Sequence, residues 1–199
     1  MHKKLFILPL LAILVAANPF FAATTKYETD VNHSNIGFSI PIMGGLSHVR
    51  GKFTDFKVSI VYDDKDVTKS SVEAVIKTTS IDTGVEGRDK HLRTADFFDA
   101  EKNPEITFKS SRIEKKGKGF IAHGTFTMRG VSKEIALPFQ INGVDRNQTT
   151  GKTVLGLTAR TTLNRRDYGI NYSRKDLPNF VGDMVEIELN IITRAATAE

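Results

Sequence analysis

The sequence of 199 residues contains no cysteine and no tryptophan, and it has no apolar run long enough to cross a membrane. Without cysteine the protein has no disulfide, no thiolate metal site and no thiol nucleophile, so its stability depends on its core. The longest apolar run has about eleven residues, whereas a membrane-spanning helix needs about twenty. We therefore expect no membrane span.

The charge distribution excludes another class of function. The formal net charge of +5 includes Lys3 and Lys4 at the amino terminus, and acidic and basic residues are interspersed through the rest of the chain. Nucleic-acid binding proteins usually carry a basic stripe interleaved with aromatic residues, which this sequence lacks. We expect no nucleic-acid partner.

The amino terminus is typical of an export signal. A basic start at residues 2–4 is followed by the apolar run Leu5–Val15 and then by small residues. Cleavage after Ala17 fits the small-x-small rule better than cleavage after Ala23, because the second site places Phe21 three positions back. Both sites stay open. The short basic start indicates a bacterial context, so we expect the protein in the periplasm or secreted.

The remainder of the chain suits one domain with a full-sized core. It contains no long internal repeat, no low-complexity segment and no linker. We therefore assign residues 1–23 to a signal peptide and residues 24–199 to a single domain.

Most of that domain alternates apolar and polar residues with period two, the pattern of half-buried β-strands. The apolar parity switches once, around Thr54-Asp55, which predicts a β-bulge there. Pro41 indicates a strand edge or bulge, because proline removes a ladder hydrogen bond. A meander of this kind forms either a sandwich or a closed up-and-down barrel. We expect eight strands, within residues 31–43, 48–62, 71–79, 105–113, 120–128, 133–141, 153–163 and 185–191.

One segment, Ser80–Asp99, has a different period. Arg88, His91, Leu92, Ala95 and Phe98 recur at steps of three and four, which is the spacing of one helix face. Asp82, Gly84 and Gly87 supply turn-forming residues before it. We expect a short helix between the third and fourth strands.

No histidine lies in a pattern typical of a metal site. His33, His48, His91 and His123 are neither in a His-Glu-x-x-His motif nor paired at ligand spacing on one strand. The acidic stretch 63–66 lacks the glycine and distal glutamate of a calcium loop, so it indicates a hairpin turn. We expect no metal and no cofactor.

Catalytic patterns are equally weak. His33 and Ser34 are neighbours on an expected strand and would point to opposite faces. The carboxylates of the helical segment could perform acid–base chemistry, but salt bridges to neighbouring basic residues explain them more simply. These are Asp82, Asp89, Asp96 and Asp99, beside Arg88, Lys90 and Arg93. We expect a protein that is not an enzyme.

Phenylalanine is abundant, with 13 residues, and many of them have the inward parity of the expected strands. One interpretation is a well-packed core. The other is an elongated apolar cavity that holds a lipid. Parity alone does not separate the two.

A set of motifs resembles the YceI-like family of exported, lipocalin-like proteins, which is described as polyisoprenoid-binding. The motifs follow the family's order over essentially the whole mature chain, and the longest of them lies in the helical segment. They are His33-Ser34-x-Ile36-x-Phe38, Gly51-x-Phe53-x-x-Phe56, Ser80-Ile81-Asp82-Thr83-Gly84, Arg88-Asp89-x-His91-Leu92-Arg93, Asp96-Phe97-Phe98-Asp99, Pro104-x-Ile106-Thr107-Phe108, Gly124-x-Phe126-Thr127-Met128-Arg129-Gly130-Val131-x-Lys133 and Asn164-Arg165-x-Asp167-Tyr168-Gly169-Ile170.

The resemblance implies an all-β fold, an eight-stranded antiparallel lipocalin-like barrel with a short helix, in which residues 24–199 enclose an apolar tunnel for an isoprenoid or fatty-acyl chain. Arg88 and His91 are the candidates for contact with a head group, and the alternative for both is a salt-bridge network that pins the helix to the barrel. We expect nine residues to line the tunnel, namely Ile36, Phe38, Ile40, Phe53, Phe108, Phe126, Met128, Leu137 and Phe139.

Three functions remain open at this point. The leading one is a periplasmic carrier or sequestering protein for an amphipathic lipid. The second is an enzyme that acts on such a lipid through His91 and an acid such as Asp89, and the third is a stress or structural protein with a filled barrel. The expected partner is the lipid, and a homodimer is left open.

Overall fold

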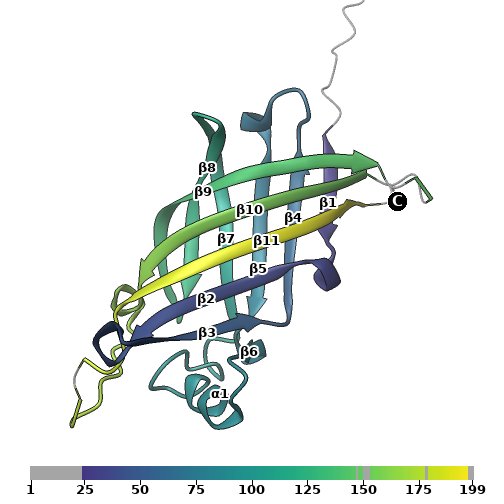
Figure 1. Ribbon diagram of the computed structural model, residues 1–199. Helices are drawn as coiled ribbons and strands as arrows, with labels where there is room; N and C mark the ends of the chain where they lie inside the picture. The colour runs from purple at the N-terminus through teal and green to yellow at the C-terminus, as the bar shows by residue number, and fades with distance from the viewer. Residues whose placement is uncertain (1–23, 147, 150–152, 178, 197–199) are drawn as a thin grey trace, which may run out of the picture.

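The computed structural model describes residues 24–146, 148–149, 153–177 and 179–196. The expected signal peptide and both of its cleavage sites lie outside the described residues. The described chain forms one antiparallel sheet that closes into a barrel, with one α-helix, α1 (Glu86–Leu92), at one end (Figure 1).

The sheet contains eleven strand segments within the described residues. They are β1 (Thr25–Thr29), β2 (Asn35–Ile42), β3 (Ser47–Phe53), β4 (Phe56–Tyr62), β5 (Ser71–Lys77), β6 (Ile81–Asp82), β7 (Glu105–Lys116), β8 (Gly119–Met128), β9 (Val131–Arg146), β10 (Thr153–Asn164) and β11 (Met184–Ala195). Short 3-10 turns separate several of them, namely η1 (Val31–His33), η2 (Met43–Gly45), η3 (Val67–Lys69), η4 (Thr78–Ser80) and η5 (Arg165–Tyr168).

The ring closes because β1 pairs with two strands, β4 on one side and β11 on the other. β1 and β2 lie end to end along β11, and β3 and β4 likewise continue one another around the ring. We count β1 with β2 as one barrel strand and β3 with β4 as another. With β5, β7, β8, β9, β10 and β11, the barrel then has eight strands. The expected eight-stranded antiparallel barrel is therefore confirmed, and the sandwich is excluded.

The parity switch at Thr54-Asp55 has a different cause from the one that we expected. It marks a break between β3 and β4 rather than a bulge within one strand. Phe53 and Phe56 on either side are both buried, because the two-residue link restores the inward direction after the turn. β3 then pairs with β2 and β6, whereas β4 pairs with β1 and β5.

Two other boundaries differ from the sequence pattern. β9 continues through Asn142-Gly143 to Arg146, because a register shift at Gly156/Leu157 lets the ladder with β10 absorb the irregularity. The helix α1 ends at Leu92, and the apolar residues that follow, including Phe98, lie in hydrogen-bonded turns. The helix lies between β5 and β7, the third and fourth strands of the barrel, and so near the expected place.

β9 pairs with a different neighbour along each part of its length. Its first part, to Phe139, pairs with β8, and its remainder, from Phe139 onward, pairs with β10. The strands β10, β11 and β2 therefore cross over β4, β5 and β7 at a steep angle (Figure 1). This arrangement leaves the inward faces of the two groups of strands opposite each other.

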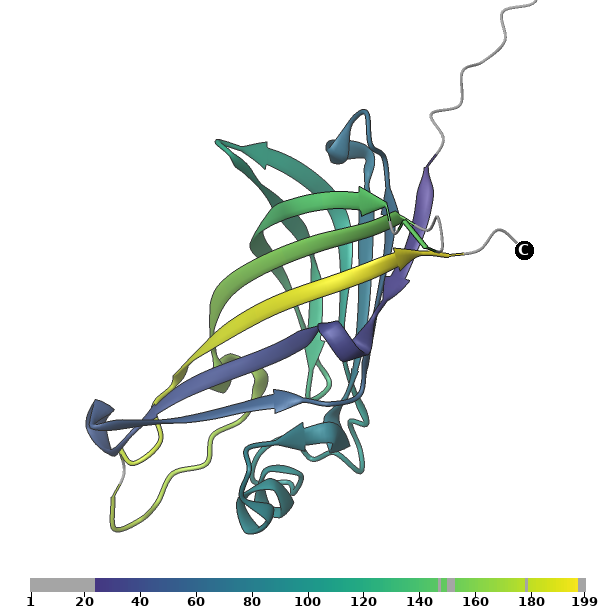
Figure 2. The same ribbon diagram turned by 45° about the vertical axis from the view of Figure 1, so that its right-hand side comes forward.

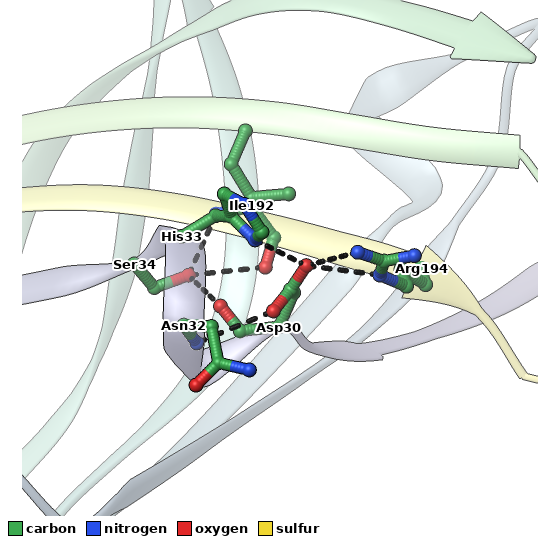
Figure 3. A network of polar contacts seen from close by, with 6 residues as sticks. All are labelled: Asp30, Asn32, His33, Ser34, Ile192 and Arg194. Atoms are coloured by element: carbon green, nitrogen blue, oxygen red, sulfur yellow. Dashed lines mark hydrogen bonds and ion pairs between the residues drawn. The ribbon is translucent and has the colours of Figure 1, made fainter. Parts of the chain in front are cut away.

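A polar network holds the point where β11 changes its partner from β2 to β1 (Figure 3). The Asp30 carboxylate accepts hydrogen bonds from Arg194 Nε at 2.9 Å and from the Asn32 backbone N–H at 3.2 Å, and His33 Nδ1 lies 2.9 Å away. Ser34 Oγ donates to the Ile192 carbonyl at 3.1 Å and accepts from the Ile192 N–H at 2.9 Å. His33 and Ser34 thus satisfy structural contacts at the seam of the barrel.

The charge of Asp30 is stabilised by this network. Its side chain is only 8% exposed, and hydrogen bonding to Arg194, aided by His33, lowers the pKa of the carboxyl group. A carboxyl group whose folded pKa is lowered stabilises the fold above its unfolded pKa of about 4, and this contribution is lost as the pH falls through the folded pKa.

We expect Asp30→Asn to lower the free energy of unfolding by about 1–3 kcal/mol at pH 7, because a charge-assisted network is lost. The difference between variant and wild type should shrink as the pH falls below about 4. Urea denaturation of variant and wild type at pH 7 and at a pH below about 4 measures this difference in the free energy of unfolding. Asp176→Asn is the control, because its exposed pair with Arg174 should contribute little. Equal unfolding midpoints for Asp30→Asn and wild type at pH 7 would contradict the assigned role.

Candidate functional site

The interior of the barrel is not completely filled. It contains a cavity of about 430 Å³, which falls within the range of roughly 300–1,000 Å³ that is typical of small-molecule sites. Its wall is formed by inward-facing apolar side chains from strands all around the ring. All nine residues that we expected to line a tunnel lie on this wall, namely Ile36, Phe38, Ile40, Phe53, Phe108, Phe126, Met128, Leu137 and Phe139. That they contact a ligand stays a prediction.

Aromatic rings account for part of the wall and part of the core. Phe53 is buried and lies 6.0 Å, between ring centroids, from both Phe38 and Phe98. Phe120 and Phe139 stack 5.5 Å apart on the facing strands β8 and β9. The packed core and the apolar cavity therefore coexist, because these rings pack against one another and the middle of the barrel stays open.

The end of the barrel near β1 and the last residues of β11 is tightly packed. Leu155 and Thr193 are completely buried there, and Tyr27 packs edge-on against Tyr62 at 6.0 Å. Burial raises the pKa of both tyrosines above the ordinary value of about 10. The acidic stretch at residues 63–66 forms the expected hairpin turn nearby, where Asp63 Oδ1 accepts from two backbone N–H groups.

The opposite end is open. Along β2 the inward residues change from buried Ile36 to half-exposed Phe38, Ile40 and Ile42, and β11 shows the same gradient from Ile191 toward Val185. We call this end the cavity mouth. It is bounded by the segment that contains α1, by η2 and by the loop of residues 171–182, which lie at the same end in both views (Figures 1 and 2).

Arg88 and His91 project from α1 onto the wall of the cavity at the mouth. Arg88 Nε donates to Thr83 Oγ1 at 2.7 Å, and its Nη2 donates to the Thr83 carbonyl at 3.0 Å. Asp89, which is buried, accepts from the Thr83 N–H at 2.9 Å. Thr83 Oγ1 also donates to Asp89 Oδ1 at 2.5 Å, so Thr83 links Arg88 to this carboxylate without a direct ion pair between the two side chains.

His91 is fixed by other contacts. Its Nε2 lies 2.8 Å from Asp96 Oδ2, and its ring packs edge-on against Phe97 and Tyr172, each with a centroid distance of 5.1 Å. The helix is attached to the barrel by Arg93, whose Nη2 donates to the Ile81 carbonyl at 3.0 Å. The expected salt bridges from Asp89 to its basic neighbours are wrong, because Asp89 caps the turn at Thr83 instead.

The loop before β11 contributes wall residues that period-two analysis does not identify, since the loop has no strand periodicity. Tyr172, Phe180 and Val181 belong to this group. The sequence feature that could have identified these wall residues is the family motif around Arg165, which lies just before the loop. Arg165 is 3% exposed, and its guanidinium donates to the carbonyls of Ile170 at 2.7 Å and of Gly182 at 2.8 Å.

Arg165 therefore ties the two ends of the loop to the barrel. Burial lowers the pKa of its guanidinium, and the neighbouring Asp183 carboxylate, 3.0 Å from Nη2, opposes that effect. A second arginine, Arg129, donates to the carbonyls of Ala95 and Gly169, and so connects the α1 segment with η5.

The described residues include no group of three or more His, Asp or Glu side chains that could hold a metal ion. In the same part of the chain, no helix is long and apolar enough to cross a membrane. The wall of the cavity is largely apolar, and its basic side chains, Arg88, His91 and Arg165, lie near the mouth.

The fold and the cavity together define a closed antiparallel β-barrel with an apolar interior that is open at one end. The chain belongs to the YceI-like family, because the profile of the YceI-like domain matches residues 27–193. The resemblance of the motifs to this family is thereby confirmed.

Relatives and solved structures agree with this assignment. A UPF0312 protein of Serratia proteamaculans is 35% identical over 159 residues, which cover 80% of this chain and 82% of the relative. The YceI protein of Campylobacter jejuni is 32% identical, with a TM-score of 0.64, over 77% of this chain and 88% of that chain. Burkholderia cenocepacia BcnA, at 19% identity and a TM-score of 0.73, covers 82% of this chain and 98% of its own, and it supports the fold alone.

We expect Arg165→Met to lower the free energy of unfolding by about 2–3 kcal/mol, because several buried carbonyl groups lose their donor. Limited proteolysis should cut faster between residues 166 and 182, and urea denaturation should show the loss of stability. Arg166→Met is the matched control, since Arg166 pairs with the same Asp183 but is exposed. Similar effects of the two substitutions would show that Arg165 does not anchor the loop.

Proposed function

We propose that this protein binds a long-chain amphipathic lipid of the isoprenoid type in the barrel cavity and carries or sequesters it after export from the cytoplasm. The observation that carries the proposal is the largely apolar cavity whose basic wall residues, Arg88, His91 and Arg165, lie near its open end. A domain of Saccharophagus degradans with the same fold is described as polyisoprenoid-binding; it is 14% identical, with a TM-score of 0.64, over 85% of this chain and 98% of its own.

The energetics favour an apolar ligand. Burial of a chain of about sixteen methylene groups gives a gross gain of about 13 kcal/mol at roughly 0.8 kcal/mol each. Association and ordering costs remove about half of this gain or more. Enough remains for tight binding without an elaborate polar site, and Met128 gives part of the wall an adaptable side chain.

The binding role is better supported than the alternatives. His91 and Asp89, the residues of an enzyme that would act on the lipid, face different partners, Asp96 and Thr83. The cavity argues against a barrel that is merely filled. The periplasmic or secreted location rests on the basic and apolar amino-terminal segment of the sequence.

We expect Leu137→Trp to exclude the ligand, because the larger side chain points into the cavity from β9. Ala136→Trp on the same strand is the matched control, since Ala136 is exposed on the outer face. Native mass spectrometry of protein purified from the periplasm should detect a bound lipid in wild type and Ala136→Trp, and much less of it in Leu137→Trp. A wild-type protein that contains no lipid and takes up no isoprenoid alcohol would rule out the carrier.

We further expect Arg88→Gln to weaken the binding of a lipid with an anionic head by about tenfold and to leave the binding of a neutral one unchanged. Titration with geranylgeranyl diphosphate and with geranylgeraniol measures the two cases. Lys90→Gln is the control, because Lys90 lies on the exposed side of α1 and pairs with Glu86. An equal loss for both ligands would mean that Arg88 acts only by holding the helix in place.

A further inference from the structure

Four large apolar side chains are exposed around the cavity mouth, on segments that border one another. Met43 and Leu46 lie at the turn between β2 and β3, Leu177 lies in the loop of residues 171–182, and Met184 begins β11. They are between 49% and 87% exposed, with Leu46 the most exposed of the four. We call these four residues the apolar rim.

Backbone contacts join the segments that carry the apolar rim. The Met43 N–H donates to the Phe180 carbonyl at 2.8 Å, the Gly182 N–H donates to the Pro41 carbonyl at 2.8 Å, and Ile42 forms a β-bridge with Val181. Figure 2 shows η2 and the loop before β11 side by side, extending beyond the end of the barrel. The rim therefore forms the tip of one connected structure.

The charges beside the apolar rim are cationic on balance. Asp176 and Asp183 pair with arginines, and Glu186, two residues after Met184, is a further exposed carboxylate. Arg50 on β3 and Lys175 in the loop are exposed, and among the described residues no carboxylate lies within ion-pair distance of either. Arg174 is neutralised by Asp176 and covers the Phe180 ring at 4.9 Å. Exposed apolar tips flanked by cations are the combination that binds the interface of an anionic bilayer.

We propose that the apolar rim docks on the surface of an anionic phospholipid bilayer, with the cavity mouth toward the lipid. Single exposed apolar residues are common and need no explanation. Here they gather at a protruding tip beside the opening of an apolar cavity, so that insertion would bring the cavity and the acyl region of the membrane together. The docking proposal rests on the proposed lipid-carrier function. It extends that function by naming the surface from which the lipid is taken or to which it is delivered.

Flotation of the purified mature protein with vesicles tests the proposal. We expect the protein to float with vesicles of phosphatidylglycerol and phosphatidylethanolamine, to float much less with phosphatidylcholine alone, and to dissociate as the salt concentration rises. The double substitution Leu46→Ser, Leu177→Ser should weaken binding at least tenfold. Arg50→Gln with Lys175→Gln should weaken binding only to the anionic vesicles.

Control variants come from the opposite end of the barrel. Val144→Ser removes an exposed apolar side chain on β9, and Lys116→Gln removes an exposed cation at the β7–β8 turn. Neither should change flotation, and circular dichroism should show that all the variants are folded. Absence of flotation, or equal losses in the rim and control variants, would overturn the proposal.

Two further measurements separate this proposal from its alternatives. One is analytical ultracentrifugation. If the protein does not float but forms a dimer, and the double substitution Leu46→Ser, Leu177→Ser abolishes the dimer, the apolar rim binds a second copy of the chain instead of a membrane. Mass spectrometry on the same preparations reports the cavity separately. Bound lipid without flotation overturns only the docking, whereas flotation without any bound lipid supports the docking and overturns the carrier.

Discussion

The pairing of β1 with both β4 and β11 is the constraint on which the rest of the structure depends. It closes the sheet into a ring, so that the apolar faces of the strands turn toward one interior. Eight antiparallel strands enclose a space that side chains either just fill or leave open for one small ligand. In this chain they fill it at the end where Leu155 and Thr193 are completely buried, and they leave it open toward the mouth. The cavity thus follows from closure together with the size of the inward residues, and no special loop is needed to create it.

The strands and their inward faces could be predicted from the sequence because period-two alternation is a local property. All nine residues chosen by parity and family motif lie on the cavity wall for this reason. The break between Phe53 and Phe56 could not be told from a bulge, because both shift the parity by one residue. The extension of β9 to Arg146 could not be predicted from the local sequence either. Asn142-Gly143 is a strong turn signal locally, but the register shift in the ladder to β10 overrides it, and that shift is a tertiary feature.

The polar groups at the mouth were harder to predict. The helical spacing placed Arg88 and His91 on one face of α1, but it did not identify the partners that hold them. Thr83 takes the contacts that the charge pattern assigned to acidic residues, since its hydroxyl and backbone groups lie at the turn that precedes the helix. The loop of residues 171–182 has no periodicity at all. Its wall residues are placed by Arg165, whose buried guanidinium gathers carbonyls that are far apart in the sequence.

The two sides of the mouth are attached to the barrel in different ways, and this bears on how a ligand would be selected. On one side α1 is fixed through Arg93 to Ile81 and through its neighbour Ala95 to Arg129. On the other side the loop depends mainly on Arg165 and on its backbone contacts with η2. An apolar wall distinguishes ligands by length and width, because dispersion and burial carry little chemical information. In the proposed function, discrimination between head groups therefore comes from the α1 side, where Arg88 and His91 lie. In the same proposal the chain enters from the other side, where the wall is half-exposed and the apolar rim projects.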